Sequence, residues 1–144
     1  MQHELPKNNS ASIDHLGIAV KNLQAAKSFY SILGLEISED EIVEQEQVKL
    51  AMVMLGDSRL ELLEPLSEGS PVGRFLARRG EGLHHIALRV PDIEARLNEL
   101  KSKGIRLVSD TVQRGAGGHL YFFVHPSSAG GVLVEVVQDA AEGE

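Results

Sequence analysis

Hydrophobic and polar residues follow the same order twice along the chain. The first copy opens with an alternating segment at 13–20, and the second copy opens with a similar one at 83–90. Such alternation predicts a strand, because successive side chains of a strand point to opposite faces. After each segment comes one polar residue, Asn22 or Asp92, and then a stretch with helical spacing. The chain therefore contains an internal repeat that begins with a strand and a helix.

The second helical stretch shows how these predictions arise. Ile93, Leu97 and Leu100 recur at helical spacing and define one apolar face. Asp92 precedes them and can accept a hydrogen bond from an unpaired backbone N–H, as an N-cap does. Gly104 follows at the place where a left-handed residue ends a helix.

Three further strand candidates follow each helix, bounded by turn residues. Between the halves, Ser70 can cap a short helix in which Pro71 takes the first position. Each half reads β-α-β-β-β. The predicted fold class is α+β, with two tandem modules forming one curved mixed sheet and the helices outside it. The strand candidates lie at 36–38, 48–55 and 59–65 in the first half, and at 106–108, 119–125 and 131–137 in the second.

The repeat sets the expected domain boundaries. Residues 1–12 are polar, lack periodicity and are expected to be a disordered tail. A single domain is expected over 13–138, divided into module one at 13–66, a connector at 67–82 and module two at 83–138.

Composition narrows the class of protein. The chain has 144 residues, enough for one compact domain, and contains no cysteine, which excludes a disulfide framework and a thiolate nucleophile. A net charge of −7 argues against a nucleic-acid surface. No apolar stretch is long enough for a membrane span. The sequence does not open with a charged and then apolar segment, so a secretion signal is not expected. A cytoplasmic protein without a membrane partner is expected.

The repeat also carries candidate chemistry. His15 and His85 occupy matching positions on the first strands of the two modules, and Glu61 and Glu135 lie on the last strands. A carboxylate within an apolar strand is costly to bury unless a partner accompanies it. Two imidazoles and two carboxylates that converge would suit a divalent transition metal. Taken singly, each residue is better explained as a structural histidine or a solvent-facing carboxylate. Taken together, the four favour a metal site, because the arrangement occurs twice in register.

Three other histidines receive no ligand role. His84 is expected to face away from the metal, since strand neighbours point to opposite sides. His119 and His125 are expected to be loop residues or to lie behind the ligands.

Several stretches together resemble a known family, the vicinal oxygen chelate superfamily, and within it the methylmalonyl-CoA epimerases. The resemblance covers about 13–138, nearly the whole chain. The double histidine and the glycine-rich stretch before Glu135 are its most specific parts. The stretches that carry it are 13–20, 61–65, 80–87, 115–118, 125–126 and 130–135.

The resemblance implies a metal centre and a substrate. Its ligands would be His15, Glu61, His85 and Glu135, with Gln replacing Glu61 in some relatives. The metal would be a divalent ion, with Co²⁺ favoured and Mn²⁺, Ni²⁺ or Zn²⁺ as alternatives. The substrate would be an acyl-CoA, and the reaction would interconvert (2R)- and (2S)-methylmalonyl-CoA by α-proton abstraction through a metal-stabilised enolate. A homodimer is implied as well.

Inversion requires a proton to leave one face of a carbon and return to the other, so two acid/base groups are expected. Glu135 is one candidate. For the second, alignment with relatives that carry a carboxylate points to Lys49, while Gln45 or its neighbours in 46–47 could position a water. A solvated charged edge explains the run at 44–49 equally well. Contacts to coenzyme A stay unassigned, with Arg114 as one candidate.

Other functions within the same superfamily remain open. A glyoxalase I-type lactoylglutathione lyase would use the same four ligands and the same stabilisation of an enediolate. Dioxygenases of the superfamily rank lower, because they need iron and fewer ligands of this kind. An antibiotic-binding module without a metal would have no need of four convergent ligands.

Overall fold

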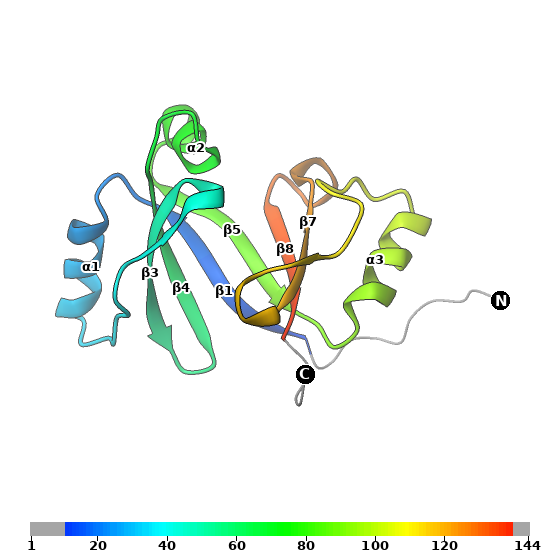
Figure 1. Cartoon of the computed structure of the whole chain (residues 1–144), viewed down its shortest axis with the longest axis horizontal. Helices are drawn as coiled ribbons and strands as arrows, with labels where there is room; N and C mark the ends of the chain where they lie inside the picture. The colour runs from blue at the N-terminus through cyan, green and yellow to red at the C-terminus, as the bar shows by residue number, and fades with distance from the viewer. Residues whose placement is uncertain (1–10, 140–144) are drawn as a thin grey trace. The chain divides into compact units, whose positions relative to one another are not determined.

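The computed structural model describes residues 11–139, so the expected tail is described only at Ala11 and Ser12. Within this range no helix has the length and apolar character of a membrane span. Figure 1 shows the elements along the chain. In order they are β1 (Ser12–Ala19), α1 (Leu23–Ile32), β2 (Glu41–Val43), the 3-10 turn Glu44–Glu46, β3 (Val48–Leu55), β4 (Ser58–Pro65), α2 (Pro71–Arg79), β5 (Gly82–Arg89), α3 (Ile93–Ser102), β6 (Gln113–Arg114), the 3-10 turn Ala116–Gly118, β7 (Leu120–Val124), the 3-10 turn Pro126–Ser128 and β8 (Leu133–Gln138).

The chain divides into two compact units. One runs from His15 to His85, and the other combines the described residues before His15 with those from Ile86 onward. The strands of the first unit follow the order β2-β3-β4-β1, and those of the second follow β8-β7-β6. β5 continues from the first unit into the second, because the boundary lies between His85 and Ile86. β1 pairs with β4 in parallel, whereas β3 pairs with both β2 and β4 in antiparallel fashion. This mixture of helices with parallel and antiparallel strands confirms the predicted α+β class.

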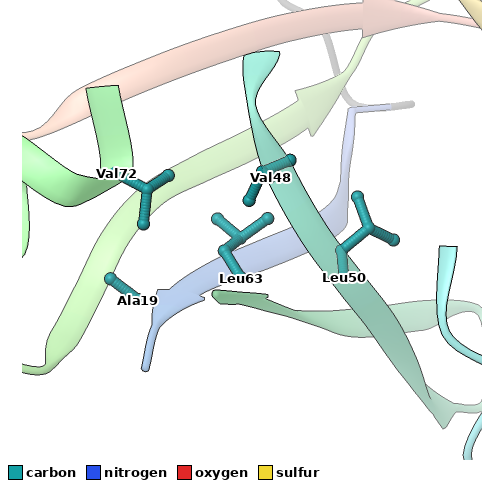
Figure 2. Packing of buried hydrophobic residues seen from close by; sticks show 5 residues of the cluster. All are labelled: Ala19, Val48, Leu50, Leu63 and Val72. Carbon is teal, nitrogen blue, oxygen red and sulfur yellow. The ribbon is translucent and has the colours of Figure 1, made fainter. Parts of the chain in front are cut away.

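Alternation along the strands gives the unit from His15 to His85 two packed faces. On one face α1 covers Ala51, Val53 and Leu62, all of which are fully buried. On the other face α2 covers a second cluster, seen in Figure 2, made of Ala19, Val48, Leu50, Leu63 and Val72. The register places Glu61 on this second face, because Glu61 and Leu63 are two residues apart on β4.

The second unit has its own core around Phe122, which is fully buried with Ile93 and Leu97 of α3. Its helix begins in the same way as α1 does. The backbone N–H of Leu23 donates to Glu64 Oε1 at 2.7 Å, and that of Ile93 donates to Gln138 Oε1 at 2.8 Å. Each acceptor comes from the last strand of its own module, so the repeat extends to the hydrogen bonds that hold helix to sheet.

Most of the predicted local features are confirmed. Asn22, Ser70 and Asp92 each accept a hydrogen bond from the third residue after them, as N-caps do. Gly104 has φ +74°, the left-handed conformation expected after α3. β3 has the predicted bounds, β4, β7 and β8 differ by one or two residues at their ends, and α2 begins at Pro71 as predicted.

Two predicted strands, at 36–38 and 106–108, are wrong. Only isolated bridges occur there, between Ile37 and Val53 and between Leu107 and Val124. Backbone hydrogen bonds beside these bridges are mixed with bonds to side chains: Ser38 Oγ accepts from the Met52 N–H, and Ser128 Oγ accepts from the Arg106 N–H. β2 and β6, which are three and two residues long, were not predicted because segments this short are too brief to show alternation.

Candidate metal centre

Two histidines that are far apart in sequence meet in the unit from His15 to His85. His15 lies on β1 and His85 on β5, and they are 7% and 5% exposed. Their Nε2 atoms are 3.0 Å apart. The ring centroids are 5.1 Å apart and the planes are perpendicular. Both imidazoles therefore direct the same nitrogen toward one point.

Glu61 on β4 completes this group. Its Oε1 lies 3.6 Å from His15 Nε2 and 3.5 Å from His85 Nε2. On β1 its register partner is Gly17, two residues beyond His15. Within residues 11–139, the three donor atoms lie within 4.8 Å of one another and could hold a metal ion. The structure thus brings together three of the four predicted ligands.

The three donors suit a divalent transition metal. Two imidazole nitrogens, each about 2.1 Å from one ion at an angle of about 90°, would be about 3.0 Å apart. The observed separation of the Nε2 atoms is 3.0 Å. The distances of 3.6 and 3.5 Å from Glu61 Oε1 are also short enough for one ion to contact all three donor atoms. Mixed imidazole and carboxylate donors are the set expected for zinc, cobalt, nickel or manganese.

Gly17 makes room for this arrangement. A Cβ atom at Gly17 would overlap the Cε1 and Nδ1 atoms of the His85 ring and would lie 2.8 Å from its Nε2. The His85 ring therefore packs directly against the backbone of β1 at Gly17. A side chain of any size at this position would displace the ligand.

The charge state of Glu61 also suits a ligand. Burial by itself raises the pKa of Glu61. The hydrogen bond from His85 and the coulombic attraction of His15, His85 and Arg59 outweigh that effect, so the pKa falls below its ordinary value of 4.5. The carboxylate is therefore ionised at neutral pH, which is the form that binds a metal.

His84 takes a position that the strand pattern did not indicate. Its Nδ1 lies 3.0 Å from Nδ1 of His85, on the side of that ring away from Nε2. Its ring packs edge-on against Phe75 of α2, with centroids 4.9 Å apart. Burial, then the neighbouring His85, lower the pKa of His84 to about 4 against a smaller opposing effect of Glu61. The imidazole is therefore neutral at pH 7. Only its sequence position beside His85 could have drawn attention to it.

Glu135, the fourth predicted ligand, lies on β8 in the other unit. It is 8% exposed and pairs in register with Phe123 of β7. A carboxylate so deeply buried needs partners that compensate its lost hydration.

Lys49 lies on a different face of the sheet from Glu61. Glu61 is directly opposite Met52 on β3, and Lys49 is three residues away, so the two side chains point to opposite faces. Lys49 Nζ is 3.8 Å from Asp40 Oδ2, while Lys27 of α1 binds Oδ1 of the same carboxylate at 2.6 Å. The structure therefore does not bring Lys49 to the three ligands.

The other residues considered lie outside the three-residue cluster of His15, Glu61 and His85. Gln45 is exposed in the 3-10 turn before β3. Arg114 is exposed on β6 and donates to the Gly118 carbonyl oxygen at 3.3 Å. His125 caps a 3-10 turn by accepting a hydrogen bond from the Ser127 N–H. The His119 ring lies against that of Tyr121, with centroids 5.5 Å apart and planes tilted by 30°.

The fold and these ligands define a class of protein. A family model described as the glyoxalase/bleomycin resistance protein/dioxygenase superfamily matches residues 14–123, and the chain belongs to this superfamily. This confirms the predicted superfamily.

Within the superfamily the chain is similar to methylmalonyl-CoA epimerases, as its motifs predicted. The mitochondrial methylmalonyl-CoA epimerase of Homo sapiens is 41% identical over 132 residues, which cover 90% of this chain and 75% of that protein. The ethylmalonyl-CoA/methylmalonyl-CoA epimerase of Cereibacter sphaeroides is 37% identical over 129 residues, covering 88% and 96%. A solved structure of methylmalonyl-CoA epimerase in complex with methylmalonyl-CoA and NH4+ is 41% identical, with a TM-score of 0.82 and coverage of 90% and 94%. These relatives are enzymes, which confirms the prediction of an enzyme of this kind.

Proposed function

We propose that this chain is a metal-dependent epimerase that interconverts the two configurations of methylmalonyl-CoA. The observation that carries the proposal is the meeting of His15, Glu61 and His85, with donor atoms within 4.8 Å, in a chain similar to such epimerases over nine-tenths of its length. As part of the proposal Glu135 is the fourth ligand and the ion is Co²⁺. We include a homodimer, as the motif resemblance implies, and a cytoplasmic location, as the composition led us to expect.

The substrate explains why such ligands would be needed. The carbon to be inverted lies between a thioester and a carboxylate, and loss of its proton places negative charge on the thioester oxygen. A bound divalent ion would supply a Lewis acid that stabilises this charge where it develops. His15, Glu61 and His85 hold that position on strands rather than on loops, which fixes the donor atoms before the substrate arrives.

Proton transfer needs groups on both faces of the inverted carbon. Glu135 is our candidate for one of them. β3 is a poor source of the second, since the residues on the face of Glu61 are Val48, Leu50 and Met52, all apolar. The Gln45 amide is neither an acid nor a base near neutral pH, so we assign it the positioning of a water.

The test follows the α-proton directly. The protein is loaded with cobalt and incubated in deuterated water with methylmalonyl-CoA of a single configuration. Mass spectrometry follows deuterium uptake, and chiral analysis follows inversion. A His85→Ala variant, which lacks one ligand, reports exchange without the metal centre.

Rapid inversion with deuterium uptake, lost in His85→Ala, is the expected result. Exchange at background level with cobalt, manganese, nickel and zinc would sink the proposal. A glutathione hemithioacetal assayed in parallel tests the lyase alternative, which shares the same ligands.

A further inference from the structure

The two nitrogens of His85 meet different partners. Nε2 faces His15 Nε2 at 3.0 Å and Glu61 Oε1 at 3.5 Å, which is the side of the metal centre. Nδ1, on the other side of the ring, lies 3.0 Å from Nδ1 of His84. The two rings are nearly perpendicular, at 85°, with centroids 5.2 Å apart. This geometry aims the edge of one imidazole at a nitrogen of the other.

Metal binding decides which atom must donate in this contact. A neutral imidazole carries one proton, and a metal on Nε2 needs the lone pair of that nitrogen. The proton of His85 must then sit on Nδ1, where His84 Nδ1 is the acceptor in line. A histidine ligand commonly donates its second N–H to a fixed acceptor, which sets both the tautomer and the orientation of the ring.

The connector between the modules holds His84 in place. Phe75 of α2 packs edge-on against the His84 ring, and the Arg79 guanidinium lies over Phe75 at 5.9 Å. The start of α2 is fixed by the Ser70 cap. A Cβ at Gly73 would overlap the Ser67 carbonyl oxygen, so the helix also needs a glycine to approach its preceding turn.

The contact is not a by-product of the repeat. Asp14 stands one residue before His15, as His84 stands before His85. Asp14 instead accepts two hydrogen bonds from Arg89, at 3.0 and 2.8 Å. Module two therefore has a histidine pair where module one has an ion pair.

We propose that His84 is a positioning residue for the metal centre, accepting the Nδ1–H of His85 and thereby directing Nε2 of His85 to the ion. The inference rests on the metal site proposed above. It assigns α2 a function as well, because Phe75 holds the acceptor in place.

Two substitutions separate hydrogen bonding from packing. His84→Phe keeps an aromatic ring against Phe75 but removes the acceptor. His84→Asn shortens the side chain but retains an acceptor oxygen near the position of Nδ1. Co²⁺ affinity is measured for both variants and for the wild type from the visible absorption of the bound ion. Circular dichroism checks that each variant is folded.

A second measurement needs no variant. Imidazole nitrogen shifts of the zinc-loaded wild-type protein, read by NMR, report which nitrogen of His85 carries the proton. We expect the proton on Nδ1, hydrogen-bonded and slow to exchange.

For the affinity measurement, we expect His84→Phe to bind Co²⁺ about 10–100-fold more weakly than the wild type, the usual effect of losing such a partner. We expect His84→Asn to bind Co²⁺ about as tightly as the wild type.

The outcomes distinguish the two proposals. A wild-type protein that binds no Co²⁺ overturns the metal centre and this inference with it. Equal affinity for the wild type and His84→Phe overturns the role of His84 while leaving the metal centre standing. A loss in His84→Asn but not in His84→Phe shows that His84 acts through packing, and equal losses in both variants show that a retained acceptor does not preserve binding. Either result overturns the inference. A His85 proton on Nε2 in the zinc-loaded protein has the same consequence.

Discussion

Replacing Gly17 with alanine tests how the metal centre depends on the close approach of β1 to a ligand. The added methyl group would overlap two atoms of the His85 ring and lie 2.8 Å from Nε2. Ordinary van der Waals contact begins near 3.4 Å, so Nε2 must retreat by at least about 0.6 Å. Backbone atoms of β1 cannot yield easily, since the strand pairs with β4 from His15 to Ala19.

That displacement exceeds what a metal ligand tolerates. Metal–ligand distances in good sites stay within about 0.2 Å of their ideal values. We therefore expect Gly17→Ala to weaken Co²⁺ binding by at least about tenfold, or about 1.4 kcal/mol. Overpacking of a buried site also costs about 1–3 kcal/mol of unfolding free energy.

The assay compares Gly17→Ala with Gly69→Ala. A Cβ at Gly69 would meet nothing within 4 Å, so this second alanine serves as a matched control. Co²⁺ titration gives the affinity, and urea unfolding of the metal-free proteins gives the stability. A folded Gly17→Ala protein that binds Co²⁺ as tightly as the control would refute the steric argument that a Cβ at this position displaces His85.

Three further expectations concern stability. Burial lowers the pKa of His84 from 6.5 to about 4, so in that window the unfolded chain takes up a proton that the folded protein does not. The metal-free protein should therefore lose about 1–3 kcal/mol of stability as pH falls from 7 to 4; urea unfolding measures this, and an unchanged profile in His84→Phe would contradict it. Glu64→Ala removes the acceptor of the Leu23 N–H and should cost about 0.5–2 kcal/mol, checked by urea unfolding against Glu68→Ala. When the free metal concentration is a hundred times the Kd, adding a chelator should lower the unfolding free energy by about 2.7 kcal/mol. A melting temperature insensitive to chelator would argue against the metal centre.

The repeat and the pairing of His15 with His85 could be predicted from the sequence, because both follow from patterns that extend over only a few residues. Strand alternation and cap residues act within a few positions, so β1, α1 and their counterparts in module two could be predicted. The positions of His15 and His85 at equal places in the repeat then indicated a shared site, and their Nε2 atoms do meet.

The side on which Lys49 lies could not be predicted in the same way. Alternation shows that neighbouring side chains face opposite ways, but it does not say which face carries the metal centre. That depends on the register with β4, where Met52 rather than Lys49 lies opposite Glu61. The alignment with relatives compared single positions and carried no information about faces.

The contact of His84 with His85 could not be predicted for a related reason. Adjacent residues of a strand point apart, so its contact with His85 depends on side-chain rotation rather than on strand geometry. The ring is held by Phe75, which belongs to the connector helix and has no counterpart in either repeated module. A contact made by a segment outside the repeat leaves no trace in the repeated pattern.

The unit that holds the metal centre starts at His15 and stops at His85, so two of its three clustered ligands are its first and last residues. During synthesis His15 and Glu61 leave the ribosome before His85. Asp14 is made 75 residues before its partner Arg89. A nascent or proteolysed chain that ends in the connector has an imidazole and a carboxylate but lacks the second imidazole. If the proposed metal centre is correct, such a fragment should bind the ion less tightly than a chain that contains β5.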